Sequence, residues 1–118
     1  MAITLLWADQ EHLWAWDTAL QHLEERCGFR VKQLHSIRKK DILNNCVGKQ
    51  ILVIHCGTIE PMANLRDVLQ AVKARFPNIK VGLETNCRHP LVEDLVDFYV
   101  VKPLTLDELE EVLKGASK

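Results

Sequence analysis

Long apolar runs, an excess of one charge and paired cysteine motifs are all missing from this chain of 118 residues. No stretch approaches the ~20 apolar residues that a membrane helix needs, so we expect no membrane span. Fifteen basic residues stand against sixteen acidic ones, and the longest basic stretch is Arg38-Lys39-Lys40. A balance this even supplies no field that would steer the domain onto a polyanion, and we therefore expect no nucleic-acid partner.

Cysteine is present without the spacing of a zinc motif or a redox motif. The four cysteines, at positions 27, 46, 56 and 87, form no CxxC pair. A chain of this length closes a core without disulfides, so reduced thiols and a cytoplasmic location are expected. The N-terminal stretch Met1–Asp9 has no basic leader and turns acidic early, so we do not expect it to be a signal peptide.

Short apolar runs alternate along the chain with segments of helical periodicity. The runs are rich in Val, Ile and Leu and have the length of buried parallel strands. We predict strands at Ile3–Ala8, Phe29–Leu34, Gln50–Cys56, Ile79–Leu83 and Phe98–Val101. We predict helices at Gln10–Arg26, Ser36–Asn45, Pro61 to about Phe76, Pro90–Val96 and from Thr105 onward.

Three of the helices carry a clear apolar stripe, with residues three or four apart. The residues expected to face the core are Leu13, Trp16, Leu20, Leu23 and Cys27, then Leu65, Leu69, Val72 and Phe76, then Leu109, Val112 and Leu113. Thr105 with Glu108 three residues later predicts a capping box at the last helix. Trp7 is predicted to lie in the core. Trp14 falls on the polar face of its helix, where it is either an interface anchor or an isolated exposed apolar residue.

Five alternating strand–helix units in one chain predict an α/β fold with helices on both faces of a parallel sheet. In this length the arrangement is that of a flavodoxin-like, doubly wound, five-stranded sheet of order 2-1-3-4-5. No linker, repeat or low-complexity segment interrupts the alternation, so residues 1–118 are predicted to be a single domain.

Several local motifs together resemble those of one protein family with this fold. Tyr99-Val-Val-Lys-Pro-Leu-Thr105 joins an aromatic residue, a Lys-Pro pair and a helix cap. Leu5-Leu-Trp-Ala-Asp-Gln-Glu11 is an apolar strand followed by acidic residues, and Gly82-Leu-Glu-Thr85 ends a strand with a hydroxyl. Leu23 to Val31 has the form of the family's exit from the first helix into the second strand. In their order and spacing these motifs resemble the receiver domain of bacterial response regulators, the phosphorelay module of two-component systems.

The resemblance implies a phosphorylation pocket at the carboxyl ends of the strands. In the family, two acids after the first strand and an aspartate after the third bind Mg²⁺, and that third aspartate accepts the phosphoryl group. A hydroxyl and a lysine hold the transferred oxygens, because the developing charge needs neutralising. The matching positions are Asp9 and Gln10 for the two acids, Gly57 for the acceptor, Thr85 for the hydroxyl, Lys102 for the lysine and Tyr99 for the switch aromatic.

The pocket implied by the resemblance is degenerate. Gly57 has no side chain to phosphorylate, and Asp9 is the one acid left of three, so we expect no Mg²⁺ binding. Lys102 is then expected to pair with Asp9 across the strand ends. Thr85 and Tyr99 are either a retained switch or a strand-end hydroxyl and a half-buried aromatic. The chain between Thr85 and Lys102 is short for the family by about one helical turn, which shortens the fourth-helix region that receivers usually use for signalling.

These features predict an atypical receiver, or pseudo-receiver: a non-enzymatic signalling domain without a cofactor that binds a protein partner and is not switched by aspartate phosphorylation. A second copy of the chain is one candidate partner. The alternative is a redox- or metal-responsive sensor, since soft ligands suit Zn²⁺ or a thiol pair. Its residues would be His55, Cys56, Cys87 and His89. A third reading, a small-molecule binder in the crevice of the fold, lacks a phosphate-cradling glycine loop.

Overall fold

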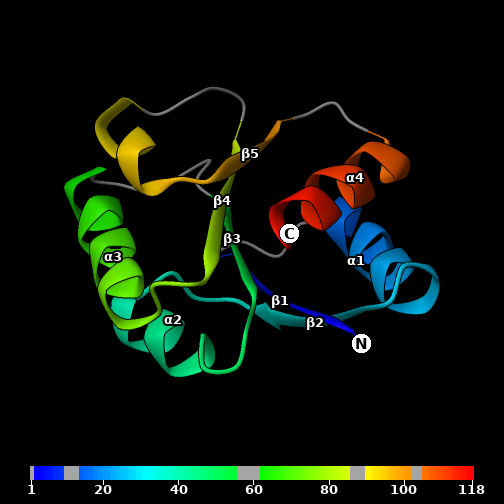
Figure 1. Cartoon of the computed structure of the whole chain (residues 1–118), viewed down its shortest axis with the longest axis horizontal. Helices are drawn as coiled ribbons and strands as arrows, with labels where there is room; N and C mark the ends of the chain where they lie inside the picture. Colours follow the sequence, from blue (N-terminus) through cyan, green and yellow to red (C-terminus); the bar gives the residue numbers. More distant parts are fainter. Residues whose placement is uncertain (1, 10–13, 56–61, 86–89, 102–104) are drawn as a thin grey trace.

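The computed structural model describes residues 2–9, 14–55, 62–85, 90–101 and 105–118 (Figure 1). Strands and helices alternate throughout these ranges. The strands are β1 (Ile3–Ala8), β2 (Phe29–Leu34), β3 (Ile51–His55), β4 (Lys80–Thr85) and β5 (Phe98–Val101). The helices are α1 (Trp14–Arg26), α2 (Lys39–Asn45), α3 (Met62–Arg75), the 3-10 helix η1 (Pro90–Leu95) and α4 (Leu106–Ala116).

The five strands form one parallel sheet in the order β2-β1-β3-β4-β5. Helices α1 and α4 lie on one side of the sheet, and α2, α3 and η1 lie on the other (Figure 1). This is the doubly wound, flavodoxin-like α/β fold predicted from the alternation of strands and helices, with the predicted strand order.

Each face of the sheet has its own hydrophobic core, because successive side chains along a strand point to opposite sides. Toward α2 and α3 the strands contribute Leu6, Ala8, Ile54 and Leu83, among others. Toward α1 and α4 they contribute Leu5, Trp7, Ile51, Val53 and Val100. Trp7 is buried as predicted, and its ring packs against Trp16 of α1 with the centroids 4.7 Å apart.

The predicted helix faces agree with the structure. Trp16, Leu20 and Leu23 of α1 are buried against the sheet, and so are Leu65, Leu69 and Val72 of α3 and Leu109 and Leu113 of α4. The predicted capping box begins α4: the Thr105 hydroxyl accepts from the Glu108 amide at 3.1 Å, and the Glu108 carboxylate accepts from the Thr105 amide at 2.9 Å. The side chains of Leu13 and Trp14 lie outside the described residues.

Some element boundaries differ from the prediction. Helix α2 begins at Lys39 and not at Ser36, because the Ser36 hydroxyl accepts from the Arg38 amide and donates to Asp41 in a turn that precedes the helix. Strand β4 runs from Lys80 to Thr85 and not from Ile79 to Leu83, since Glu84 is accommodated inside the sheet.

The predicted fourth helix is a 3-10 helix of six residues, η1. Its Val92 is fully buried against the α3 side of the core. Arg66 of α3 holds Asp94 of η1 through two parallel contacts, Nη1 to Oδ1 at 2.9 Å and Nη2 to Oδ2 at 3.0 Å. The shortened segment is therefore fixed to α3 by one buried side chain and one forked ion pair.

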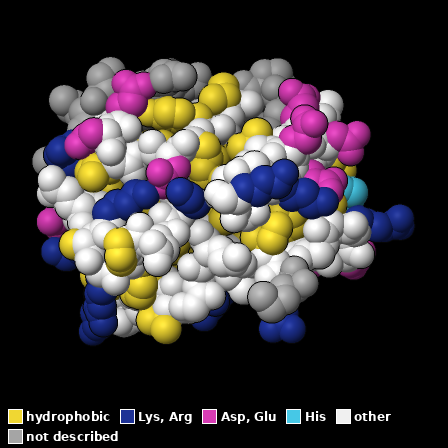
Figure 2. Space-filling model, in the orientation of Figure 1, with side chains coloured by type: hydrophobic (Ala, Val, Ile, Leu, Met, Phe, Trp, Pro, Cys, Tyr) yellow, Lys and Arg dark blue, Asp and Glu magenta, His cyan; other side chains and the backbone are white. Residues whose placement is uncertain are grey.

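In the part of the chain that the structure describes, none of the helices is both long and apolar enough to span a lipid bilayer. On the face shown in Figure 2, basic side chains form a row across the middle of the view, and most acidic side chains lie above that row.

Candidate functional site at the carboxyl ends of the strands

Buried polar side chains gather at one edge of the sheet. Among the described residues, the buried polar or charged side chains are Asp9, Glu84 and Thr85, exposed by 4%, 2% and 5%. Asp9 directly follows β1, while Glu84 and Thr85 end β4. Because all strands are parallel, both places lie at the carboxyl edge of the sheet, where doubly wound folds place their functional groups.

His55 and Glu84 form the centre of this edge. They are register partners on the neighbouring strands β3 and β4, and the His55 Nδ1 contacts the Glu84 Oε2. Alternation along β3 puts His55 on the same face as Ile51 and Val53, the face covered by α1 and α4. A carboxylate at such a position needs a partner, because an uncompensated buried charge is strongly unfavourable. The imidazole supplies that partner.

Asp9 extends the same row of side chains. Its amide donates to the Leu34 carbonyl at 2.8 Å, which continues the β1–β2 pairing past Ala8. Since Ala8 is paired with Ile54, the next position of β1 lies beside His55. Asp9, His55 and Glu84 therefore occupy adjacent positions across three neighbouring strands. Two acids flank one imidazole, an arrangement suited to holding a proton or a cation between them.

Thr85 and Tyr99 belong to the opposite face. Thr85 follows Glu84 and therefore points toward the α2 and α3 side, as does Leu83. Tyr99 is half-buried and packs against the core on that side as the register partner of Leu83, two residues before Val101, the partner of Thr85. Thr85 therefore ends a strand and Tyr99 is half-buried, and the switch role implied by the resemblance stays a prediction.

The structure thus brings Asp9, His55 and Thr85 to one sheet edge, with Tyr99 close to it. The other predicted site residues, Gln10, Gly57, Lys102, Cys56, Cys87 and His89, lie outside the described residues. Their assignments, the Asp9–Lys102 pair and the alternative metal site stay predictions.

Glu84 is the site residue that sequence reasoning missed. It lies at the end of an apolar strand, between Leu83 and Thr85, and it is buried. Its position in that apolar run is the sequence signal that could have predicted a buried carboxylate. Its partner could not be predicted, because the pairing with His55 depends on the β3–β4 register.

Comparison with known proteins finds likeness at the level of structure. A scan against models of protein families finds no match, and a search of curated proteins finds no relative by sequence. A CheY-like response regulator receiver domain protein from Methanospirillum hungatei JF-1 is similar in structure, with a TM-score of 0.77, 17% identity, and 99% of this chain and 94% of that chain covered.

Two further solved structures widen this comparison. An orphan response regulator of H. pylori has a TM-score of 0.73 and 12% identity, with 98% of this chain and 97% of that chain covered. A putative pilus assembly-related protein from Burkholderia pseudomallei K96243 has a TM-score of 0.73 and 21% identity, with 98% of this chain and 89% of that chain covered. At these identities the likeness establishes the fold, which is that of CheY-like receiver domains, and function has to be argued from the site.

Proposed function

We propose that this domain is a pseudo-receiver: a non-enzymatic module of intracellular signal transduction that binds a protein partner and is not switched by aspartate phosphorylation. The observation that carries the proposal is the His55–Glu84 pair at the ends of β3 and β4. Receiver-like architecture supports the signalling role, and the chemistry of this edge supports the loss of the phosphorylation switch.

The end of β3 offers no phosphorylatable carboxylate. The sequence reads His55-Cys56-Gly57 where the strand ends, so every register leaves the acceptor position without an aspartate. A buried acid on the neighbouring strand β4, Glu84, is engaged by the imidazole of His55. A Mg²⁺ ion is usually held by one or two carboxylates together with waters and phosphate oxygens. At this edge the buried Glu84 carboxylate already contacts an imidazole, which supports the absence of a Mg²⁺ site.

The β5–α4 corner is the surface we propose for the partner. β5 is an edge strand, and its last residue, Val101, is 43% exposed, while Leu106 at the start of α4 is 40% exposed. Apolar side chains beside an unpaired strand edge favour contact with another protein.

The phosphorylation part of the proposal is tested by exposing the full chain to acetyl phosphate and Mg²⁺ and measuring its intact mass. We expect no change, whereas a receiver with an intact acceptor gains a phosphoryl group under the same conditions. A stoichiometric phosphoryl adduct that hydroxylamine removes would contradict the proposal.

The partner surface is tested by placing a photo-crosslinking residue at Val101 in cells. The control is the same residue at Lys32, which is exposed on β2 at the opposite edge of the sheet. We expect a discrete crosslinked product from position 101 and none from position 32. A product of twice the chain mass would identify a second copy as the partner, and equal products at both positions would argue against a β5–α4 interface.

A further inference from the structure

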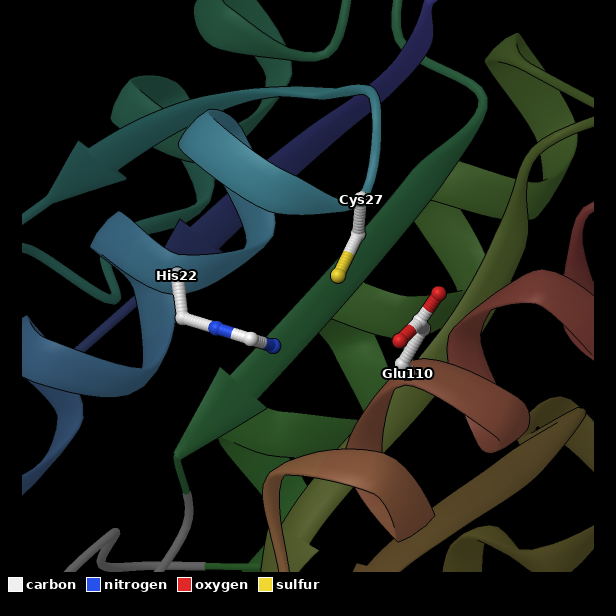
Figure 3. A group of neighbouring side chains, drawn as sticks. All are labelled: His22, Cys27 and Glu110. Carbon is white, nitrogen blue, oxygen red and sulfur yellow. The ribbon is translucent and has the colours of Figure 1, made fainter.

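A second group of chemically active side chains lies away from the strand edge, between α1 and α4. It consists of His22, Cys27 and Glu110, which we call the interhelix cluster (Figure 3). One potential ligand atom from each residue lies within 4.8 Å of the other two, and all three side chains are half-buried. Figure 3 shows the imidazole and the carboxylate reaching from the two helices toward the sulfur.

The local fold fixes two members of the cluster on one short segment. His22 belongs to α1, and Cys27 follows the last helical residue, with its amide donating to the Leu23 carbonyl at 3.2 Å. Gly28 then adopts φ of +76°, which turns the chain into β2 and leaves Cys27 at the helix end. Glu110 is next to the buried Leu109, so it lies at the border between α4 and its packing surface.

The three side chains are the ligand types that zinc takes from proteins: thiolate sulfur, imidazole nitrogen and carboxylate oxygen. At zinc–ligand bonds of ~2.0–2.3 Å, tetrahedral ligand atoms lie about 3.5 Å apart. The cluster would have to contract by roughly one ångström, which rotations of the half-buried His22 and Glu110 side chains allow. Three protein ligands leave one coordination position open for water.

We propose that His22, Cys27 and Glu110 form a binding site for one zinc ion or a similar borderline-soft divalent cation, with a water molecule as fourth ligand. The ion would tie the end of α1 to the middle of α4, two helices separated by more than half of the chain. This site is distinct from the strand edge at His55, and it departs from the cofactor-free domain expected from the sequence.

A bound metal ion would have to displace the groups that now interact with its ligands, namely the Lys114 ammonium and the Cys27 thiol proton. Lys114 Nζ lies 2.5 Å from Glu110 Oε2, and since its side chain is 45% exposed it can swing into solvent. The pKa of Cys27 is raised by burial first, then by a hydrogen bond and charge effect from Glu110 and by the charge of Asp107, with Lys114 acting in the opposite direction. The pKa of Glu110 is lowered, chiefly by Lys114. Metal binding therefore replaces the thiol proton, which is released to solvent, while the carboxylate is already ionised.

Titration of the reduced full chain with Co²⁺, followed by absorption, tests the proposal. We expect one equivalent to give the intense visible bands of tetrahedral cobalt and a near-ultraviolet thiolate charge-transfer band, and one equivalent of Zn²⁺ to remove both. Cys27→Ser should abolish the thiolate band, and Glu110→Gln and His22→Gln should each weaken binding about tenfold or more. The matched controls are His35→Gln, which changes an exposed histidine elsewhere, and the Cys56→Ser, Cys87→Ser double variant, which removes two other thiols.

The Lys114→Met variant tests the proposal even if the ligand variants fail to fold. It leaves all three ligands in place and removes the competing cation, so it should tighten binding severalfold. The proposal is overturned if the thiolate band persists in Cys27→Ser, if it is lost in the Cys56→Ser, Cys87→Ser variant instead, or if the bound metal is substoichiometric and insensitive to Lys114→Met.

Discussion

The contact between the partly buried His55 and the buried Glu84 is a feature of the residue scale. Removing one member of a buried, paired charge leaves the other without compensation, which typically costs 3–5 kcal/mol. Replacing both members by apolar side chains removes the desolvation cost together with the attraction, and is often close to neutral. The pair should therefore show strong coupling and little net stabilisation.

This expectation is measurable in a double-mutant cycle. We expect Glu84→Leu alone to lower the free energy of unfolding by about 3 kcal/mol, because it replaces the carboxylate that contacts the His55 imidazole by an apolar side chain. His55→Leu alone should cost a similar amount, since it removes the imidazole contact of the buried Glu84 carboxylate. The double variant should lose clearly less than the sum of the two in urea unfolding. Strict additivity would show that the contact contributes nothing specific.

Cys46 offers a second residue-scale test. Burial raises the pKa of its thiol to about 11, with the charge of Lys49 acting in the opposite direction. Because the folded pKa lies above the unfolded one, this thiol favours the folded state below about pH 9, and that contribution is lost as pH rises toward 11.

Iodoacetamide labelling followed by peptide mapping measures how well the fold protects the Cys46 thiol. At pH 8 we expect the Cys46 peptide to stay unmodified in the native protein and to react readily in urea, because almost none of the folded thiol is ionised or accessible. Equal labelling rates in the two conditions would show that the thiol is not protected by the fold.

At the scale of elements, the capping box of α4 is the clearest link from sequence to structure. Thr105 and Glu108 satisfy each other's backbone amides at the start of the helix. Thr105→Ala should lower the free energy of unfolding by about 1 kcal/mol, the usual cost of losing an N-cap hydroxyl. Thr105→Ser, which keeps the hydroxyl, is the control and should lose little. Thermal unfolding of the three proteins compares them, and an equal loss in both variants would assign the effect to the Thr105 methyl group.

The strands and helices could be predicted because each apolar pattern has either the length of a strand or the periodicity of a helix. β1, β2 and β5 match their predicted bounds. β4 was truncated in the prediction because Glu84 has no place in an apolar pattern unless its partner is known. The start of α2 was placed too early because the hydrogen bonds of Ser36 form a turn before the helix begins.

Contacts between side chains of different helices and strands could not be predicted from the sequence. The interhelix cluster depends on α1 and α4 lying on the same side of the sheet and in one rotational setting, and its members give no shared spacing in the chain. The position of His55 beside Glu84 likewise needs a register that no local pattern encodes. By contrast, Asp9 and Thr85 could be placed at one edge, because the carboxyl ends of parallel strands share an edge whatever the register.

At the scale of the whole molecule, the sheet order makes stability uneven. β1, β3 and β4 are paired on both sides, while β2 and β5 are edges, and the radius of gyration of 13.0 Å is that of a compact body. We expect amide hydrogen exchange to be slowest in β1 and β3 and faster in β5, because edge strands open without breaking the central pairing. Exchange measured peptide by peptide decides this. Slowest exchange in β5 would mean that another contact, such as a second copy of the chain, covers that edge.

The contact between Trp7 and Trp16 gives the molecule an optical signature. Two indole rings with centroids 4.7 Å apart and planes tilted by 43° are close enough for their electronic transitions to mix. Such mixing splits a transition into two bands of opposite circular dichroism, with a sign set by the handedness of the ring arrangement. Because one ring belongs to the sheet and the other to α1, the split signal exists only while that helix is docked. The split circular dichroism signal of Trp7 and Trp16 therefore reports whether α1 is docked on the sheet, without any attached label.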